Sequence, residues 1–147
     1  MNILAFLSFL SLLGIVSGAT FQDCGSTVKN LQIHIPNCPG SGPACIFTSG
    51  QTASIEAAFT GAAPFRSATV KLSGVIGHIK IPFPLTSPEA CGRWGLECPS
   101  AAGAHQTLRV DIPITSQYPK VKVGVELQLV SDTAETLICK TIPVEIK

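Results

Sequence analysis

Residues 79–91 read Ile-Lys-Ile-Pro-Phe-Pro-Leu-Thr-Ser-Pro-Glu-Ala-Cys, an apolar stretch rich in proline. Its three prolines exclude an α-helix or a central strand, because proline lacks a backbone N–H donor and has a fixed φ. A spacing of two places four apolar side chains on one face of an extended segment: Ile79, Ile81, Phe83 and Leu85. The stretch is therefore either an edge strand that leaves a core or a stiff wall of an apolar pocket.

The chain has 147 residues, and its N-terminal segment, up to about Ala19, is predominantly apolar. This segment ends in small residues and is too short for a membrane span, so we predict a signal peptide over residues 1–19. Cleavage after Gly18 or Ala19 would leave a single domain of ordinary size over residues 20–147. The mature protein is expected to be soluble and exported.

Six cysteines follow the predicted signal peptide, which fits three disulfides formed in an oxidising compartment. The two closest couples, each flanking a short loop, are Cys38 with Cys45 and Cys91 with Cys98. Pairing each couple locally would leave Cys24, near the mature start, to pair with Cys139, near the end. The absence of a C-x₂-C spacing argues against a zinc site.

The chain carries ten basic and nine acidic residues, a formal net charge of +1. No basic tract of the kind that follows phosphates is present, so we do not expect a nucleic-acid partner. Charged residues make up only 13% of the chain, and the apolar residues must therefore either fill a large core or line a cavity. No Asn-x-Ser/Thr sequon is present, and N-glycosylation is not expected.

Short segments with apolar residues at alternate positions recur along the mature chain, separated by Gly, Pro and Ser. The expected strands cover residues 31–35, 53–59, 68–72, 75–81, 107–114, 121–129 and 136–146. Gly74 and Gly77 divide the third and fourth of these segments, and the odd positions from Val121 to Leu129 are expected in the core. Seven or eight short strands indicate a two-sheet β-sandwich.

The residue inventory argues against an enzyme. The three histidines, His34, His78 and His105, are scattered, and none stands in a metal-ligand spacing. There is no G-x-S-x-G motif, and three disulfides would leave no cysteine nucleophile. Asp111 and Glu126 fall at strand positions expected to face solvent, with no sign of a carboxylate pair. We expect no cofactor and no metal.

The only tryptophan, Trp94, lies in the short loop between Cys91 and Cys98. Antibody domains instead bury a tryptophan against a central disulfide between the sheets, so this sandwich must be held together differently. Trp94 follows Arg93, and two interpretations stay open. An exposed ring beside a cation would suit a membrane or partner contact, whereas a packed ring would stabilise its own loop.

Several motifs together resemble one family. They are Asp23-Cys-Gly-Ser26, Ile81-Pro-Phe-Pro84, Ile112-Pro-Ile-Thr-Ser-Gln-Tyr-Pro119 and Cys139-Lys-Thr-Ile-Pro-Val-Glu-Ile146. With the six cysteines as spaced, the mature chain resembles the ML lipid-recognition family, which includes the secreted sterol carriers of the Niemann–Pick type C-two kind and the group-two mite allergens. Any single motif is weakly specific, but their order along the chain is distinctive.

The resemblance implies an all-β fold, an immunoglobulin-like β-sandwich of two antiparallel sheets that splay around an apolar cavity. It also implies the disulfides Cys24–Cys139, Cys38–Cys45 and Cys91–Cys98.

By position, the resemblance implies that Phe83, Ile114 and Tyr118 line the pocket mouth. Phe59, Val125 and Leu127 are expected as deeper lining, although a core role is equally open for them. An outer surface formed by Glu89, Arg93 and Trp94 is expected to meet a membrane or a partner during transfer.

This chain departs from the sterol carriers at several positions. Leu127 and Lys140 stand where those carriers have tryptophan, and Gly92 replaces a basic residue, although Arg93 follows it. The loop between Cys91 and Cys98 is one residue longer. These changes leave the ligand and the docking surface open.

We therefore expect a secreted, monomeric lipid-binding and transfer protein that holds a sterol or similar hydrophobic molecule between its sheets. The missing sequon favours free secretion over delivery to the lysosomal lumen. The alternative is a module that presents a fatty acid, a semiochemical or a microbial lipid to a receptor in immunity or chemosensing. Contact with a membrane or receptor is expected to be transient.

Overall fold

A computed structural model describes residues 21–36, 38 and 44–147 of the chain. The predicted signal peptide lies outside the described residues. Nine strands form the described part: β1 (Gln22–Asp23), β2 (Lys29–His34), β3 (Cys45–Phe47), β4 (Thr52–Thr60), β5 (Ala68–Ile76), β6 (Ile79–Pro82), β7 (His105–Pro113), β8 (Lys122–Ser131) and β9 (Thr136–Ile146). Within these residues we find no helix with the length and apolarity needed to cross a membrane.

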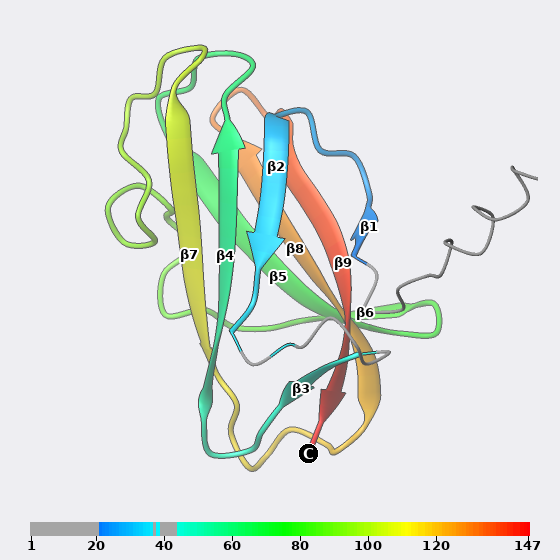
Figure 1. The fold of residues 1–147 in the computed structure, drawn as a ribbon. Helices are drawn as coiled ribbons and strands as arrows, with labels where there is room; N and C mark the ends of the chain where they lie inside the picture. Colours follow the sequence, from blue (N-terminus) through cyan, green and yellow to red (C-terminus); the bar gives the residue numbers. More distant parts are fainter. Residues whose placement is uncertain (1–20, 37, 39–43) are drawn as a thin grey trace, which may run out of the picture.

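The strands form two sheets that face each other (Figure 1). A six-stranded sheet has the order β1-β9-β8-β5-β6, with β3 also paired to β9, and a three-stranded sheet has the order β2-β4-β7. The predicted two-sheet sandwich is confirmed, and its pairs are antiparallel except for β3, which runs parallel to β9. The strand count exceeds seven or eight because β1 and β3 span only two and three residues, too few for an alternating pattern to reveal.

The core lies between the two sheets and follows the predicted alternation. In β4, Ile55, Ala57 and Phe59 are buried, and in β8 every odd position from Val123 to Leu129 is buried. These side chains belong to one continuous apolar cluster to which both sheets contribute. Burying a full Leu or Ile side chain stabilises a fold by about 1.5–3 kcal/mol.

The predicted division between the third and fourth strands at Gly74 is wrong, because β5 continues through this glycine to Ile76. A Cβ atom at Gly74 would lie 3.2 Å from Cε2 of Phe83 and 3.3 Å from Cγ2 of Val123. The glycine therefore makes room for a ring and does not end the strand. The turn comes instead at Gly77, whose φ of +63° suits glycine. β6 follows and forms an edge of the six-stranded sheet, as the prolines predict.

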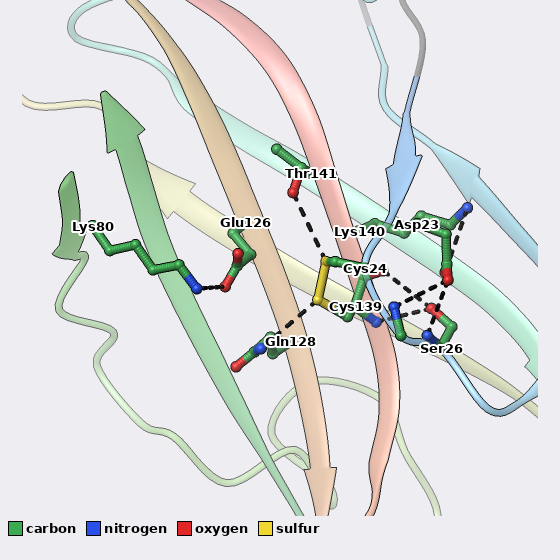
Figure 2. Close-up of a disulfide and its surroundings, with 10 residues drawn as sticks. Asp23, Cys24, Ser26, Lys80, Glu126, Gln128, Cys139, Lys140 and Thr141 are labelled. Carbon is green, nitrogen blue, oxygen red and sulfur yellow. Dashed lines mark hydrogen bonds and ion pairs between the residues drawn. A yellow bond between two sulfur atoms is a disulfide. The ribbon is translucent and has the colours of Figure 1, made fainter. Parts of the chain in front are cut away.

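All three implied disulfides are present. Cys38–Cys45 and Cys91–Cys98 each span seven residues, and Cys24–Cys139 spans 115. The long bridge joins the segment after β1 to β9 (Figure 2). A loop of this length constrains the unfolded chain by roughly 4–5 kcal/mol in the loop-entropy description. The sandwich is thus held at its chain ends and not by a central bridge between the sheets.

Glu126 does not face solvent as predicted. Its side chain is only 11% exposed, and its Oε1 atom accepts a hydrogen bond of 3.0 Å from Nζ of Lys80. Figure 2 shows Lys80 reaching over the neighbouring strand to Glu126, close to the Cys24–Cys139 disulfide. Lys80 covers this carboxylate although it stands 46 positions before Glu126 in the sequence. The alternation of residues along a single strand cannot reveal such a contact.

Candidate functional site

The proline-rich stretch after β6 brings two aromatic rings together. The N–H of Phe83 donates to the carbonyl of Leu72 over 2.8 Å, so backbone pairing with β5 continues past Pro82. Tyr118 lies in the connection between β7 and β8, where its N–H donates to the Thr115 carbonyl. The rings of Phe83 and Tyr118 meet edge to face with centroids 5.4 Å apart. We call this pair the mouth.

An apolar hollow of about 150 Å³ lies at the mouth, and only hydrophobic residues and glycine contribute to it besides Tyr118. It is lined by Gly74, Ile76, Ile81, Pro82, Phe83, Pro84, Tyr118, Pro119, Val121, Val123 and Ile146. Directly paired residues of neighbouring strands share a face of the sheet, so the pairs Gly74–Ile81 and Ile76–Ile79 lie on the same face as buried Leu72. The hollow therefore belongs to the inner face of the six-stranded sheet.

This end of the inner face is not covered by the opposite sheet. Ile76, Ile79 and Ile81 are 44%, 66% and 52% exposed although they continue the core-facing side of β5 and β6. The β5–β6 hairpin projects at the right of Figure 1, beyond the three strands of the smaller sheet. Val121, predicted in the core, is 36% exposed because it flanks the hollow just before β8. The prediction for Val121 is therefore wrong.

A second depression, which we call the side groove, has a volume of about 570 Å³. It is lined by Thr52, Pro84, Leu85, Thr86, Arg93, Trp94, Asp111, Pro113, Thr115 and Tyr118. Pro84 and Tyr118 line both the hollow and the side groove, so the two spaces adjoin at the mouth. Polar and charged groups lie in the side groove, whereas the hollow is apolar.

The packed alternative for Trp94 is confirmed, and the exposed alternative is wrong. The ring is only 7% exposed, and its Nε1–H donates to the carbonyl of Ser87 over 2.9 Å. Arg93 and Glu89 are exposed, as a surface contact would require. The guanidinium of Arg93 lies 5.4 Å from the centre of the Trp94 ring, and its Nη2 donates to Oγ1 of Thr86 over 3.0 Å. Their expected role in transfer stays a prediction.

The remaining predicted site residues lie in the core. Phe59, Ile114, Val125 and Leu127 are each at most 3% exposed, and none lines the hollow or the side groove. They would contact a ligand only if the sheets parted. Sequence reasoning missed Gly74, Ile76, Val123 and Ile146 as lining of the hollow. The continued alternation of β5 into Ile76 and of β8 into Val123 was the available signal.

The titratable groups do not gather into a reactive site. In the described part of the chain His34, His78 and His105 are exposed, and His105 Nδ1 lies 2.9 Å from Oγ1 of Thr60. Asp111 accepts a hydrogen bond of 2.7 Å from Oγ of Ser54. All six cysteines are in disulfides, so the one cluster of metal-type donors there, formed by two cysteines and a glutamate, has no free thiolate.

Comparisons with known proteins agree with this geometry. The ML domain pattern matches residues 18–146. The ecdysteroid-regulated 16 kDa protein of Manduca sexta is 32% identical over 86% of this chain and 87% of that protein. NPC intracellular cholesterol transporter 2 of Mus musculus is 31% identical over 86% of this chain and 83% of that protein.

A solved structure shows the same fold. The crystal structure of a Niemann–Pick type C2 protein from the Japanese carpenter ant matches with a TM-score of 0.80 and 25% identity. The match covers 87% of this chain and 99% of that one. The family pattern over residues 18–146 and the 32% identity to the Manduca sexta protein show that the protein belongs to the ML domain family.

Proposed function

We propose that this protein binds one lipid molecule whose apolar part enters between the two sheets at the mouth. The observation that carries this proposal is the uncovered inner face around the apolar hollow. Soluble proteins rarely leave contiguous apolar surface exposed without a use for it. Three exposed isoleucines beside an apolar hollow are therefore best explained as the opening through which an apolar ligand passes.

The size of the hollow indicates how binding proceeds. Ligand pockets for small molecules usually measure about 300–1,000 Å³, whereas the hollow measures about 150 Å³. A lipid must therefore displace Phe83 and Tyr118 and part the side chains behind them. The predicted deeper lining, Phe59, Val125 and Leu127, would then become ligand contacts, as would Ile114, which was predicted at the mouth but lies in the core. Each of these side chains is apolar and already faces the space between the sheets.

The energetics favour a carrier that needs no reacting group. Burying about 400 Å² of sterol surface is favourable by on the order of 10 kcal/mol at ~25 cal/mol/Å². Ordering and association costs remove several kcal/mol, which leaves affinities in the micromolar to nanomolar range. The Tyr118 hydroxyl is suited to orient a polar end, because its ring is apolar and its tip is polar.

The names of relatives support a sterol or a similar lipid as the ligand. One relative is named as an intracellular cholesterol transporter. We infer a secreted, monomeric carrier without enzymatic activity, with Glu89 and Arg93 on the surface that meets a membrane or a receptor.

Lipid extraction tests this proposal. The protein would be purified from its source in its natural disulfide-bonded form, and bound lipids would be identified by mass spectrometry. A sterol at about one molecule per chain is the expected result. Fatty acids or acylated saccharides would instead favour the lipid-presenting alternative. Protein without lipid that also binds neither a fluorescent sterol nor a fluorescent fatty acid would contradict the proposal.

A further inference from the structure

The side groove adjoins the mouth and contains a cation, Arg93, that is held in place by neutral groups. We propose that the side groove receives the head group of the bound lipid and that Arg93 selects lipids whose head is a single anion, such as a carboxylate or a sulfate. This inference rests on the proposed function, because it requires that the lipid tail occupies the hollow. It adds the chemical class of the ligand's polar end.

The position of the side groove supports this assignment. Pro84 and Tyr118 line both spaces, so a molecule that enters the apolar hollow between them has its other end at the side groove. The hollow offers no charged group to a ligand, whereas the side groove offers the guanidinium of Arg93 and hydroxyl groups. The apolar tail of an amphipathic ligand would therefore lie in the hollow, and its polar head would lie in the side groove.

Arg93 is oriented before any ligand binds. Its Nη2 donates to Oγ1 of Thr86, and its guanidinium packs on the ring of Trp94. Trp94 is itself fixed, because its Nε1–H donates to Ser87 and its carbonyl accepts the N–H of Arg109 over 2.8 Å. An arginine whose rotamer is already restricted loses little conformational entropy when it forms a charge-assisted hydrogen bond.

The charges around the side groove leave Arg93 available for an anion. Asp111 also lines the groove, but its Oδ1 accepts a hydrogen bond from Ser54 and lies 3.5 Å from Nε of Arg109. Arg109 offsets only part of the charge of Asp111, because the same guanidinium also lies 3.4 Å from Oε1 of Glu56. Among the residues that the structure describes, Arg93 forms no ion pair with any carboxylate. An anionic head group of a ligand would supply the partner for this guanidinium.

The experiment separates the charge of the head from the nature of the tail. Two matched pairs of ligands compete with a fluorescent lipid probe for the disulfide-bonded protein: a fatty acid with its methyl ester, and cholesterol sulfate with cholesterol. Each pair is titrated against the wild type, against Arg93→Gln, and against Arg66→Gln as a control. Arg66 is an exposed arginine in the loop before β5 and lines neither the hollow nor the side groove.

We expect the wild type to bind the anionic member of a pair roughly three- to tenfold more tightly than its neutral partner, and less so at high salt. Arg93→Gln should abolish this preference while leaving the neutral ligand's affinity unchanged, and Arg66→Gln should retain it. The pair that shows the effect identifies an acyl chain or a sterol as the tail. Equal affinities in the wild type, or a preference that survives Arg93→Gln, would overturn the inference. If the wild type binds neither the fluorescent probe nor any of the four ligands, the proposed function is overturned instead.

Discussion

The inner face of the six-stranded sheet has a covered part and an uncovered part. Around the middle of β8 and β9, Leu127, Leu129 and Ile138 have no exposed surface. On β6 the same face carries Ile79 and Ile81, which are more than half exposed. The two parts have the same residue types and the same strand alternation. The part on β8 and β9 is covered by other core side chains, whereas the part on the edge strand β6 is not.

This difference explains how one sheet can serve both stability and binding. The covered part excludes water permanently and holds the fold together. The uncovered part leaves apolar groups beside a small hollow, closed on one side by Phe83 and Tyr118. A ligand that enters there would bury the exposed apolar side chains of the uncovered part. Its binding would be driven by the same hydrophobic effect that stabilises the covered part on folding.

The largest expected effect tests the covered part. Leu127→Ala removes a fully buried side chain and should reduce the free energy of unfolding by about 2–5 kcal/mol. Ile81→Ala, at the uncovered part, should cost about 1 kcal/mol or less, because the side chain is 52% exposed. Urea unfolding with the disulfides intact measures both. Equal losses would show that the two parts are covered alike.

An intermediate effect is expected at the ion pair that ties β6 to the rest of the sheet. Lys80→Met should cost about 1 kcal/mol, because Glu126 is largely buried and loses the one cation that pairs with it among the described residues, although the exposure of Lys80 weakens the pair. Lys71→Met on β5 is the matched control, since Lys71 is exposed and forms no ion pair in the described structure. A control variant that loses as much stability as Lys80→Met would contradict this account.

A smaller change in stability, but a clear change in ligand exchange, is expected for Gly74→Ala. The new methyl group would lie 3.2 Å from the ring of Phe83, and the ring can yield because it is only partly buried. Displacement of the ring should open the mouth, so a fluorescent lipid should associate and dissociate faster in stopped-flow measurements. Unchanged rates would mean that the position of Phe83 does not control access.

The smallest effect is expected far from the mouth, at Asp132. The backbone N–H groups of Arg66 and Ser67 donate to its carboxylate and lower its pKa below the ordinary value of 3.8. The folded state is thus stabilised by the ionised form, and this contribution is lost as the pH falls through the lowered pKa. Asp132→Asn should be slightly less stable than the wild type at neutral pH. In thermal unfolding the difference should vanish in acid, and a difference independent of pH would contradict the assignment.

Alternation along the sequence predicted the long strands because their two faces have different surroundings. It could not reveal β1 and β3, which are too short to alternate, or the continuation of β5 through Gly74, where the glycine leaves room for the ring of Phe83. Periodicity also assigns residues to a face without showing whether that face is covered. For this reason the exposure of Val121 and the burial of Glu126 were both predicted wrongly.

The site could be predicted only in part. Proline spacing left an edge strand and a pocket wall as alternatives, and the resemblance to the ML family directed attention to Phe83 and Tyr118. The structure places these two rings in contact. Ile146 was missed as lining of the hollow because it comes from the end of β9, and its meeting with the ends of β5 and β6 depends on the twist and pairing of the sheet.

The most direct test of lipid binding at the mouth is the affinity of a fluorescent sterol for Phe83→Ala compared with Phe21→Ala. Phe21 is also a partly buried phenylalanine, but it lies next to β1, at the opposite edge of the six-stranded sheet from β6. Loss of the Phe83 ring removes about 1.5–3 kcal/mol of apolar contact, so the dissociation constant should rise roughly ten- to hundredfold. Phe21→Ala should bind like the wild type. Tight sterol binding by the wild type and equally tight binding by Phe83→Ala would contradict the central claim.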